Sequence, residues 1–302
     1  MHAFLEADMG EKPALQPKAA IGPAVRAIAV SILAEARAAI TDPERTQQDA
    51  VHAFRRAMKG WRALMRLLQP FIPDAVTLRQ QARDHARSLA RARDGQSALN
   101  AFDDLMEKSV ALSARSAATI RSRIEAIRGN EEQAVLTEEL RETIIAWLEA
   151  TTAAVEQWPL DPFDFSSIAE QLAVGYREAR RRIPEDWSQA TAEDLHQLRQ
   201  RVVDHRYQME LVEPLWPRHG RMWTEEAERL RDRLGRCQDL EILKRLTGPH
   251  QPLAHWRSRL APACAERTAA LAHRAARIAL RLFAEKPKAF RRRLETLWEH
   301  GR

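Results

Sequence analysis

The sequence has few of the residues on which several protein classes depend. Its 302 residues include only two cysteines, Cys237 and Cys264, and neither belongs to a Cys-x-x-Cys pair. This scarcity argues against a disulfide framework and against a cysteine zinc site. No stretch approaches about 18 uninterrupted apolar residues, so no membrane-spanning helix is expected. Residues 1–15 include acids and no apolar core of signal-peptide length, and the cytoplasm is therefore the expected compartment.

The motifs of phosphate-processing enzymes are absent as well. No Gly-x-x-x-x-Gly-Lys loop occurs, and the basic helices described below carry almost no acids that could hold Mg²⁺ beside a phosphate. Asp84-His85 and Asp204-His205 are adjacent pairs that diverge by about 100° on a helix, so neither pair can easily share a metal ion. The sequence therefore predicts a protein without catalytic residues, metal or cofactor.

Strand signals are missing too, whereas helix formers are abundant. Only 10 glycines occur, no segment alternates apolar and polar residues like a strand, and Ala, Leu, Arg, Glu and Gln dominate. With 45% hydrophobic and 30% charged residues, the chain is predicted to be globular and all-α. Residues 1–20 are expected to form a loose tail, and prolines divide the rest. Helices are predicted at about 23–40, from after 43 to 69, and at 73–93, 95–109, 111–128, 131–157, 164–182, 192–213, 222–235, 238–246, 262–284 and 287–299.

The chain contains an internal duplication. At a constant offset of 144 residues the following pairs match: His52 and His196, Phe54 and Leu198, Arg55 and Arg199, Arg62 and Arg206, Pro70 and Pro214. The proline-containing segment 158–162 is the best boundary between the two halves. The sequence therefore predicts two helical bundles, at about 21–157 and 160–300, each holding one histidine helix.

The first histidine helix has two chemically different faces. Five cations fall within an arc of about 80°, which carries no acid. We call these five residues the cationic stripe: His52, Arg55, Lys59, Arg62 and Arg66. The opposite side is apolar, with Phe54, Met58, Trp61, Leu64, Met65, Leu68 and Phe71. Like charges at these spacings repel, which favours an anionic ligand over the alternative of a solvated helix face.

The second histidine helix keeps less of this pattern. It retains three residues on the corresponding arc: His196, Arg199 and Arg206. Val203 and Glu210 occupy the positions of the other two cations. His205 points toward the apolar side and is expected to be a buried, hydrogen-bonded histidine.

Other basic residues are weaker candidates for ligand contact. An Arg-x-x-Asp sequence follows each histidine helix by one helix, at 91–94 and 236–239. Its aspartates, Asp94 and Asp239, are expected to cap the next helices. Its arginines, Arg91 and Arg236, are better candidates for binding ligand or for pairing with those aspartates. Clusters elsewhere, each typical of a solvated face unless several converge, include Arg79, Arg83, Arg87, Arg177, Arg180 and Lys286.

These motifs resemble the CHAD family, the conserved histidine α-helical domain. The resemblance rests on Val-His-x-Phe-Arg-Arg-x-x-Lys-x-x-Arg at 51–62, Leu-His-x-Leu-Arg at 195–199, the two Arg-x-x-Asp sequences, Tyr-Arg-x-Ala-Arg-Arg at 176–181 and Arg-Leu-Phe-Ala-Glu-Lys-Pro at 281–287. It implies two four-helix bundles with a pseudo-twofold relation, and a basic surface or central channel that binds inorganic polyphosphate. It also implies a standalone, non-catalytic module, since the chain is too short to include a fused triphosphate-processing domain.

By motif position, the resemblance implies eight ligand-facing residues: His52, Arg55, Arg56, Lys59, Arg62, His196, Arg199 and Arg206. Inorganic polyphosphate is the expected partner, with other polyanions as further ligands and polyphosphate-processing enzymes as protein partners. Within the cytoplasm, polyphosphate granules are the structures with which such a module would associate.

Two other functions stay open. Lys and Arg number 48 against 42 Asp and Glu, for a formal charge of +6, which is compatible with non-specific nucleic-acid binding. Aromatic residues make up only 6%, however, and no helix-turn-helix or zinc-finger signature occurs. The other alternative is a polyphosphate-processing enzyme, which the missing P-loop and acidic cluster disfavour.

Overall fold

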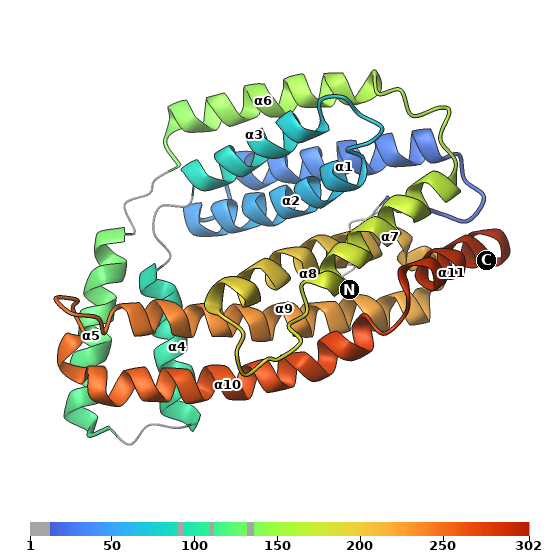
Figure 1. The fold of residues 1–302 in the computed structure, drawn as a ribbon. Helices are drawn as coiled ribbons and strands as arrows, with labels where there is room; N and C mark the ends of the chain where they lie inside the picture. Colours follow the sequence, from blue (N-terminus) through green and yellow to red (C-terminus); the bar gives the residue numbers. More distant parts are fainter. Residues whose placement is uncertain (1–12, 90–93, 109–111, 132–135, 302) are drawn as a thin grey trace, which may run out of the picture.

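The computed structural model describes residues 13–89, 94–108, 112–131 and 136–301. Within these ranges the chain forms eleven α-helices, two short 3₁₀ turns and no strand, so the predicted all-α class is confirmed (Figure 1). No described helix is both long enough and apolar enough to span a bilayer. The helices are α1 (Ile21–Thr41), α2 (Gln47–Leu67), α3 (Ala75–Ser88), α4 (Asp94–Lys108), α5 (Ala114–Glu131), α6 (Glu138–Glu156), α7 (Phe165–Arg181), α8 (Ala192–Val212), α9 (Pro217–Arg245), α10 (Arg257–Leu282) and α11 (Pro287–His300).

Two predicted boundaries are wrong. The break expected at 235–238 does not exist, because α9 is one helix of 29 residues that runs through Gly235. Packing against α8 on one side and α10 on another holds this helix together through its glycine. α10 begins at Arg257 rather than 262 and contains Pro262. The proline falls in the second turn, where it removes a single backbone hydrogen bond.

The two histidine helices, α2 and α8, begin in the same way. Thr46 caps α2 by accepting a hydrogen bond from the Asp49 backbone N–H at 3.2 Å. Thr191 caps α8 by accepting from the Asp194 backbone N–H at 3.1 Å, and Asp194 accepts in turn from the Thr191 N–H at 3.0 Å. Such caps satisfy N–H groups that have no partner within the helix. Both helices therefore begin with a Thr-x-x-Asp cap, although the offset between the two caps is 145 residues and that between the two histidines is 144.

The helices form two groups that meet along α2 and α8. α1, α2, α3 and α6 lie together in the upper part of Figure 1, and α7 to α11 lie below them. α4 and α5 come from the first half of the sequence, but α4 packs on α9 and carries α5 with it. The three-dimensional grouping of helices thus differs from their order along the chain.

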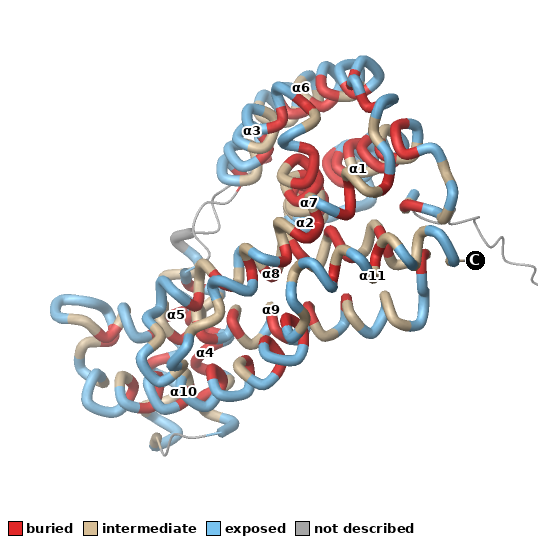
Figure 2. Tube along the Cα trace, turned by 45° about the vertical axis from the view of Figure 1, so that its right-hand side comes forward, coloured by how far each residue is buried: buried red, intermediate tan, exposed pale blue. Residues whose placement is uncertain are grey.

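The apolar side of α2 supplies much of the core of the upper group. Phe54, Met58, Trp61 and Met65 are all fully buried, as the sequence predicted (Figure 2). Trp61 also lies 6.0 Å, between ring centroids, from Trp158 in the segment that joins the two halves. The buried face of α2 fixes the orientation of its opposite, cationic face.

An ion pair ties α4 to α10. Both Asp104 carboxylate oxygens accept from Arg267, at 2.6 and 2.8 Å, and the two side chains are only 14% and 7% exposed. The hydrogen bonds from Arg267 hold the pKa of Asp104 below its usual value. Because the unfolded chain takes up a proton at higher pH, this stabilisation is full above about pH 5 and is lost as pH falls through the folded pKa.

We expect Asp104→Asn to lower the free energy of unfolding at pH 7 by about 1–3 kcal/mol, since a charged hydrogen-bond partner is lost. The difference from wild type should shrink below about pH 4, because the unfolded chain then takes up a proton at Asp104 before the folded protein does. Urea unfolding at pH 7 and pH 3.5 measures both effects. Asp103→Asn is the matched control, because the Asp103–Arg121 pair is half exposed and should contribute little. Equal losses for the two variants would contradict this role for Asp104.

Candidate functional site

The cationic stripe lies beside the contact between α2 and α8. Gly60 lies against the Tyr207 ring, which a Cβ at this position would meet in ordinary van der Waals contact at 3.6 Å. The Tyr207 hydroxyl donates to the Arg56 carbonyl at 3.4 Å, and Gln208 donates to the Ala63 carbonyl at 3.2 Å. On the stripe, His52 is exposed and the four other cations are half-buried. The predicted division of α2 into an apolar and a cationic face is confirmed.

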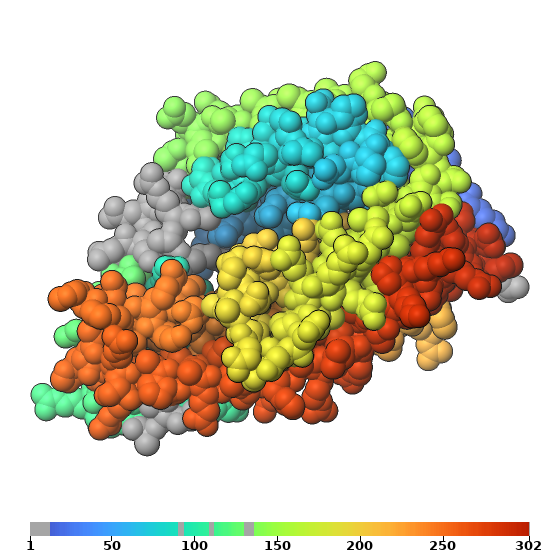
Figure 3. Space-filling view, in the orientation of Figure 1, coloured from blue at the N-terminus to red at the C-terminus, as the bar shows by residue number. Residues whose placement is uncertain are grey.

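α3 brings further arginines to the same place. Burial lowers the pKa of Arg62, and the neighbouring Arg83, Arg66 and Arg87 lower it further, against the opposing effect of Asp204. Burial lowers the pKa of Arg79 in the same way, and its neighbours include Arg66, Arg62 and Arg201. In the space-filling view, atoms of α2 are visible at the bottom of a hollow between α3 and α8 (Figure 3). We call this hollow the α2–α3–α8 groove and define it by Arg62, Arg66, Arg79, Arg83, Arg87 and Arg201.

Two carboxylates neutralise one end of the groove. Arg66 pairs with Asp204 at 2.8 Å, and Arg201 pairs with Glu178 of α7 at 2.9 Å. Burial raises the pKa of Asp204, while the surrounding arginines, Arg66 first, act to lower it. The stripe contains no acid along its own helix, as predicted, but Asp204 of α8 pairs with Arg66 from outside that helix. Helical periodicity describes one helix at a time and does not show which acids other helices supply.

The cations of the second histidine helix face α9. Both ring nitrogens of His196 are hydrogen-bonded to glutamine amides, one from Gln200 and one from Gln238 of α9. Arg199 lies over Gly235, where a Cβ would come within 3.4 Å of its Nε. Arg206 pairs with Glu210 at 2.7 Å and lies 3.7 Å from Glu228 of α9. His196 and Arg206 therefore already have polar neighbours from the protein itself.

The remaining predicted ligand contacts are dispersed. Arg236 is on α9 and lies 3.7 Å from Asp104. Arg180 donates to the Phe283 carbonyl at 3.1 Å, near exposed Lys286 at the start of α11. Arg177 is exposed on α7, and Arg91 lies outside the described residues.

The two predicted aspartate caps have different outcomes. Asp239 lies inside α9 and cannot cap a helix start, so that prediction is wrong. The continuity of α9 is the physical reason, since no new helix begins there. Asp94 is the first residue of α4 and lies 3.4 Å from Arg245, and its role as a helix cap stays a prediction.

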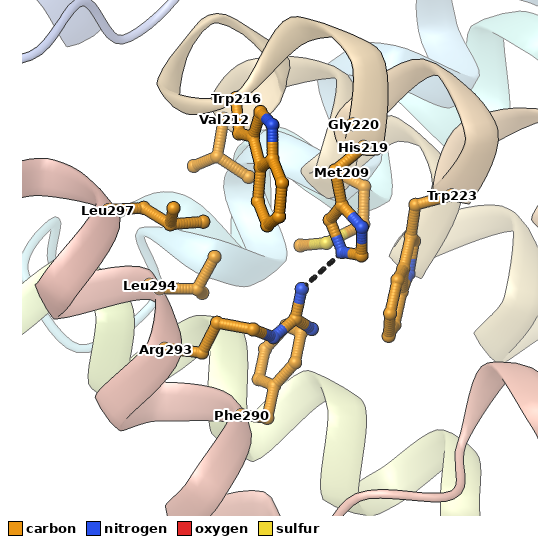
Figure 4. Close-up of a pocket in the computed structure, with 10 residues that line it drawn as sticks. All are labelled: Met209, Val212, Trp216, His219, Gly220, Trp223, Phe290, Arg293, Leu294 and Leu297. Carbon is orange, nitrogen blue, oxygen red and sulfur yellow. Dashed lines mark hydrogen bonds between the residues drawn. The ribbon is translucent and has the colours of Figure 1, made fainter. Parts of the chain in front are cut away.

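A second polar cluster lies where α9 meets α11, and it is structural. His205 is 1% exposed, and its Nε2 accepts from Trp223 Nε1 at 2.8 Å, which confirms the predicted buried histidine. The His219 ring stacks on Trp216 at 4.9 Å and is tilted relative to Trp223, 5.5 Å away, and it forms a hydrogen bond with Arg293 (Figure 4). The cavity among them is about 20 Å³, room for about one water molecule.

The chemistry available at the α2–α3–α8 groove is anion binding. Guanidinium groups offer several N–H donors in a planar fork that matches phosphate oxygens. Among the described residues, no three histidine, cysteine or acidic side chains are placed to hold a metal ion together. Burial raises the pKa values of Cys237 and Cys264 to about 12, so these thiols are not reactive nucleophiles.

Fold and groove together define an all-helical protein with two histidine helices and an arginine-lined surface. A profile of the CHAD domain matches residues 25–248, and the chain belongs to the CHAD family. The crystal structure of the CHAD domain from the plant Ricinus communis is similar over 98% of this chain and 97% of that one, with 19% identity and a TM-score of 0.59. At this identity the likeness shows a shared fold. None of the curated proteins matches the chain.

The buried histidine should make folding acid-sensitive. Burial lowers the pKa of His205 to about 3, whereas the unfolded value is about 6.5. Its contribution to stability is therefore full above about pH 6.5 and declines toward about pH 3, by up to about 1.4 kcal/mol per pH unit. His205→Gln retains an acceptor for Trp223 and cannot be protonated in this range.

Between pH 6.5 and 4.5, we expect wild type to lose roughly 2–3 kcal/mol more unfolding free energy than His205→Gln. Urea titrations at each pH provide the measurement. His273→Gln, at an exposed position of α10, is the control and should follow wild type. Parallel pH profiles for wild type and His205→Gln would exclude His205 as the acid-sensitive group.

Proposed function

We propose that this protein binds inorganic polyphosphate, without turning it over, along the cationic stripe and the α2–α3–α8 groove. The observation that carries the proposal is the convergence of six arginines from three helices, of which Arg66 pairs with Asp204 and Arg201 with Glu178. Burial already disfavours the charge on Arg62 and Arg79, and their mutual repulsion adds to that cost. A polyanion in the groove would offset both effects.

Polyphosphate fits this surface better than nucleic acid does. Single-stranded nucleic acids are usually held by exposed aromatic rings on which bases stack. Here Phe54 and Trp61 are buried on the far side of α2, and Tyr207 is packed against Gly60. A linear polyphosphate has no bases, so a row of guanidinium, ammonium and imidazole groups suffices to bind it. Enzymes that make or use polyphosphate are the protein partners, and polyphosphate granules the site of action, that this proposal suggests.

Removing the central charges of the stripe tests the proposal. We expect Arg55→Gln, Lys59→Gln and Arg62→Gln together to weaken polyphosphate binding severely. The slope of log affinity against log salt should also flatten by roughly 2, at about 0.7 per lost phosphate contact. Because glutamine is a good helix former, helicity and melting temperature should stay close to those of wild type. Binding titrations at several salt concentrations and circular dichroism provide these measurements.

The matched control for the triple variant removes equal charge elsewhere. Arg37, Arg45 and Arg121 pair with acids on exposed surfaces, and their replacement by Gln should leave binding close to wild type. Duplex DNA at equal phosphate concentration should compete poorly with polyphosphate for wild type. The proposal fails if the stripe variant and the control variant bind alike, or if DNA competes as well as polyphosphate does.

Asp204 should act as an internal competitor for the ligand. Its carboxylate occupies Arg66 at 2.8 Å and lies 4.0 Å from Arg201, so we expect Asp204→Asn to bind polyphosphate more tightly and with a steeper salt dependence. The free protein should lose stability, by up to about 3 kcal/mol, because half-buried Arg66 loses the partner that lies 2.8 Å away. Melting temperatures with and without polyphosphate measure both effects. Weaker binding by Asp204→Asn would instead show that this carboxylate orients the arginines for the ligand.

A further inference from the structure

A second group of arginines lies on a different side of α9, away from the histidine helix. Arg229, Arg233 and Arg236 of α9 fall within an arc of about 60°, and Arg267, Arg274 and Arg281 of α10 fall within about 40°. Gly235, over which Arg199 of α8 lies, is roughly 130° from the middle of the α9 arc. We call these six residues the arginine patch: Arg229, Arg233, Arg236, Arg267, Arg274 and Arg281.

Two non-covalent contacts between α9 and α10 fix how the halves of the patch face each other. Arg281 of α10 lies 3.4 Å from Glu226 of α9, and the Cys237 thiol of α9 points to the Thr268 carbonyl of α10 at 4.0 Å. The two helices are therefore antiparallel neighbours, and Arg233 and Arg274 lie between these two contacts. In agreement, burial lowers the pKa of Arg233, and among its charged neighbours Arg274 lowers this pKa most, followed by Arg236, Arg229 and Arg267.

Carboxylates neutralise the ends of the patch and leave its centre positive. Glu226 lies 2.6 Å from Arg229 and 3.4 Å from Arg281, so it neutralises charge at one end of the patch. Asp104 of α4 pairs with Arg267 and lies 3.7 Å from Arg236, so it neutralises charge at the other end. Among the described residues, no carboxylate lies within 4.0 Å of Arg233 or Arg274.

The central arginine also has unused hydrogen-bonding capacity. Arg233 is half-buried, and its Nε has no hydrogen-bond partner although water does not reach it. A desolvated cation with four arginine neighbours is costly unless an anion approaches it. Arg274 is exposed and lies opposite, so an anion between the two would receive forked N–H donors from both helices. The patch has six arginines, and Glu226 and Asp104 neutralise only part of their charge, so a ligand with several negative charges can bind there.

We propose that the arginine patch is a second anion-binding site, separate from the α2–α3–α8 groove, and that it takes condensed phosphate. The patch contains no aromatic side chain on which a base could stack, which disfavours single-stranded nucleic acid. Arginine pairs facing each other across two helices suit a short phosphate chain that lies between them. The site uses none of the residues of the groove, so its existence does not depend on the function proposed above.

The test counts binding sites for inorganic tripolyphosphate by titration calorimetry. Wild type should bind two tripolyphosphate ions per chain, and Arg233→Gln with Arg274→Gln should bind one. The affinity remaining at the patch should fall by about tenfold or more for each guanidinium lost. The stripe variant, with Arg55, Lys59 and Arg62 replaced by Gln, should lose the other site. Arg37→Gln with Arg121→Gln removes the same charge as the patch variant and should keep both sites.

The outcomes separate the two proposals. If the patch variant binds as many ions as Arg37→Gln with Arg121→Gln does, the arginine patch is not a site, whatever the stripe variant does. If only the patch variant loses a site, the patch stands and the proposed function of the groove fails. Arg274→Glu is a second variant, whose carboxylate should pair with Arg233 and abolish patch binding while raising the melting temperature. If the patch variants weaken binding of single-stranded DNA but not of tripolyphosphate, the proposed ligand class is wrong.

Discussion

The contact between α2 and α8 is the constraint on which the groove depends. The Tyr207 hydroxyl donates to the Arg56 carbonyl, and Gln208 donates to the Ala63 carbonyl. With this contact made and the apolar side of α2 buried, the cationic stripe can only face the space next to α3 and α8. Arg62 and Arg79 there are partly desolvated, and the neighbouring arginines repel them. Packing of the apolar side must therefore supply the free energy that holds these charges together.

The two histidine helices are alike in sequence and cap but differ in surroundings. α2 meets a helix that carries arginines, so the charges of the two add. α8 meets α9, which provides Gln238, Glu228 and the open backbone at Gly235. Glu210 lies one turn beyond Arg206 and neutralises it. The repeated motif therefore lies in a strongly cationic surface at α2, whereas at α8 Gln238 and Glu210 already contact two of its side chains.

Much of this arrangement follows from the sequence, and what does not follow has a physical reason. Helical periodicity places Phe54 and Trp61 opposite the stripe and predicts the burial of His205, because these are properties of a single helix. The pairing of Arg66 with Asp204 and of Asp104 with Arg267 joins residues more than a hundred positions apart. Gly235 predicts a break in α9 by propensity alone, but packing of α9 against α8 and α10 outweighs that preference.

The continuity of α9 matters for both cationic surfaces. One side of this helix accommodates His196 and Arg199 of α8, and another side presents Arg233 toward Arg274 of α10. A break at Gly235 would separate the residues that α8 needs from those that align with α10. A continuous helix fixes the register of both contacts at once. Because α9 is a single helix, the distance between the side that faces α8 and the side that carries Arg233 is fixed. A charge introduced on one side therefore acts on the charges of the other side without any movement of the protein.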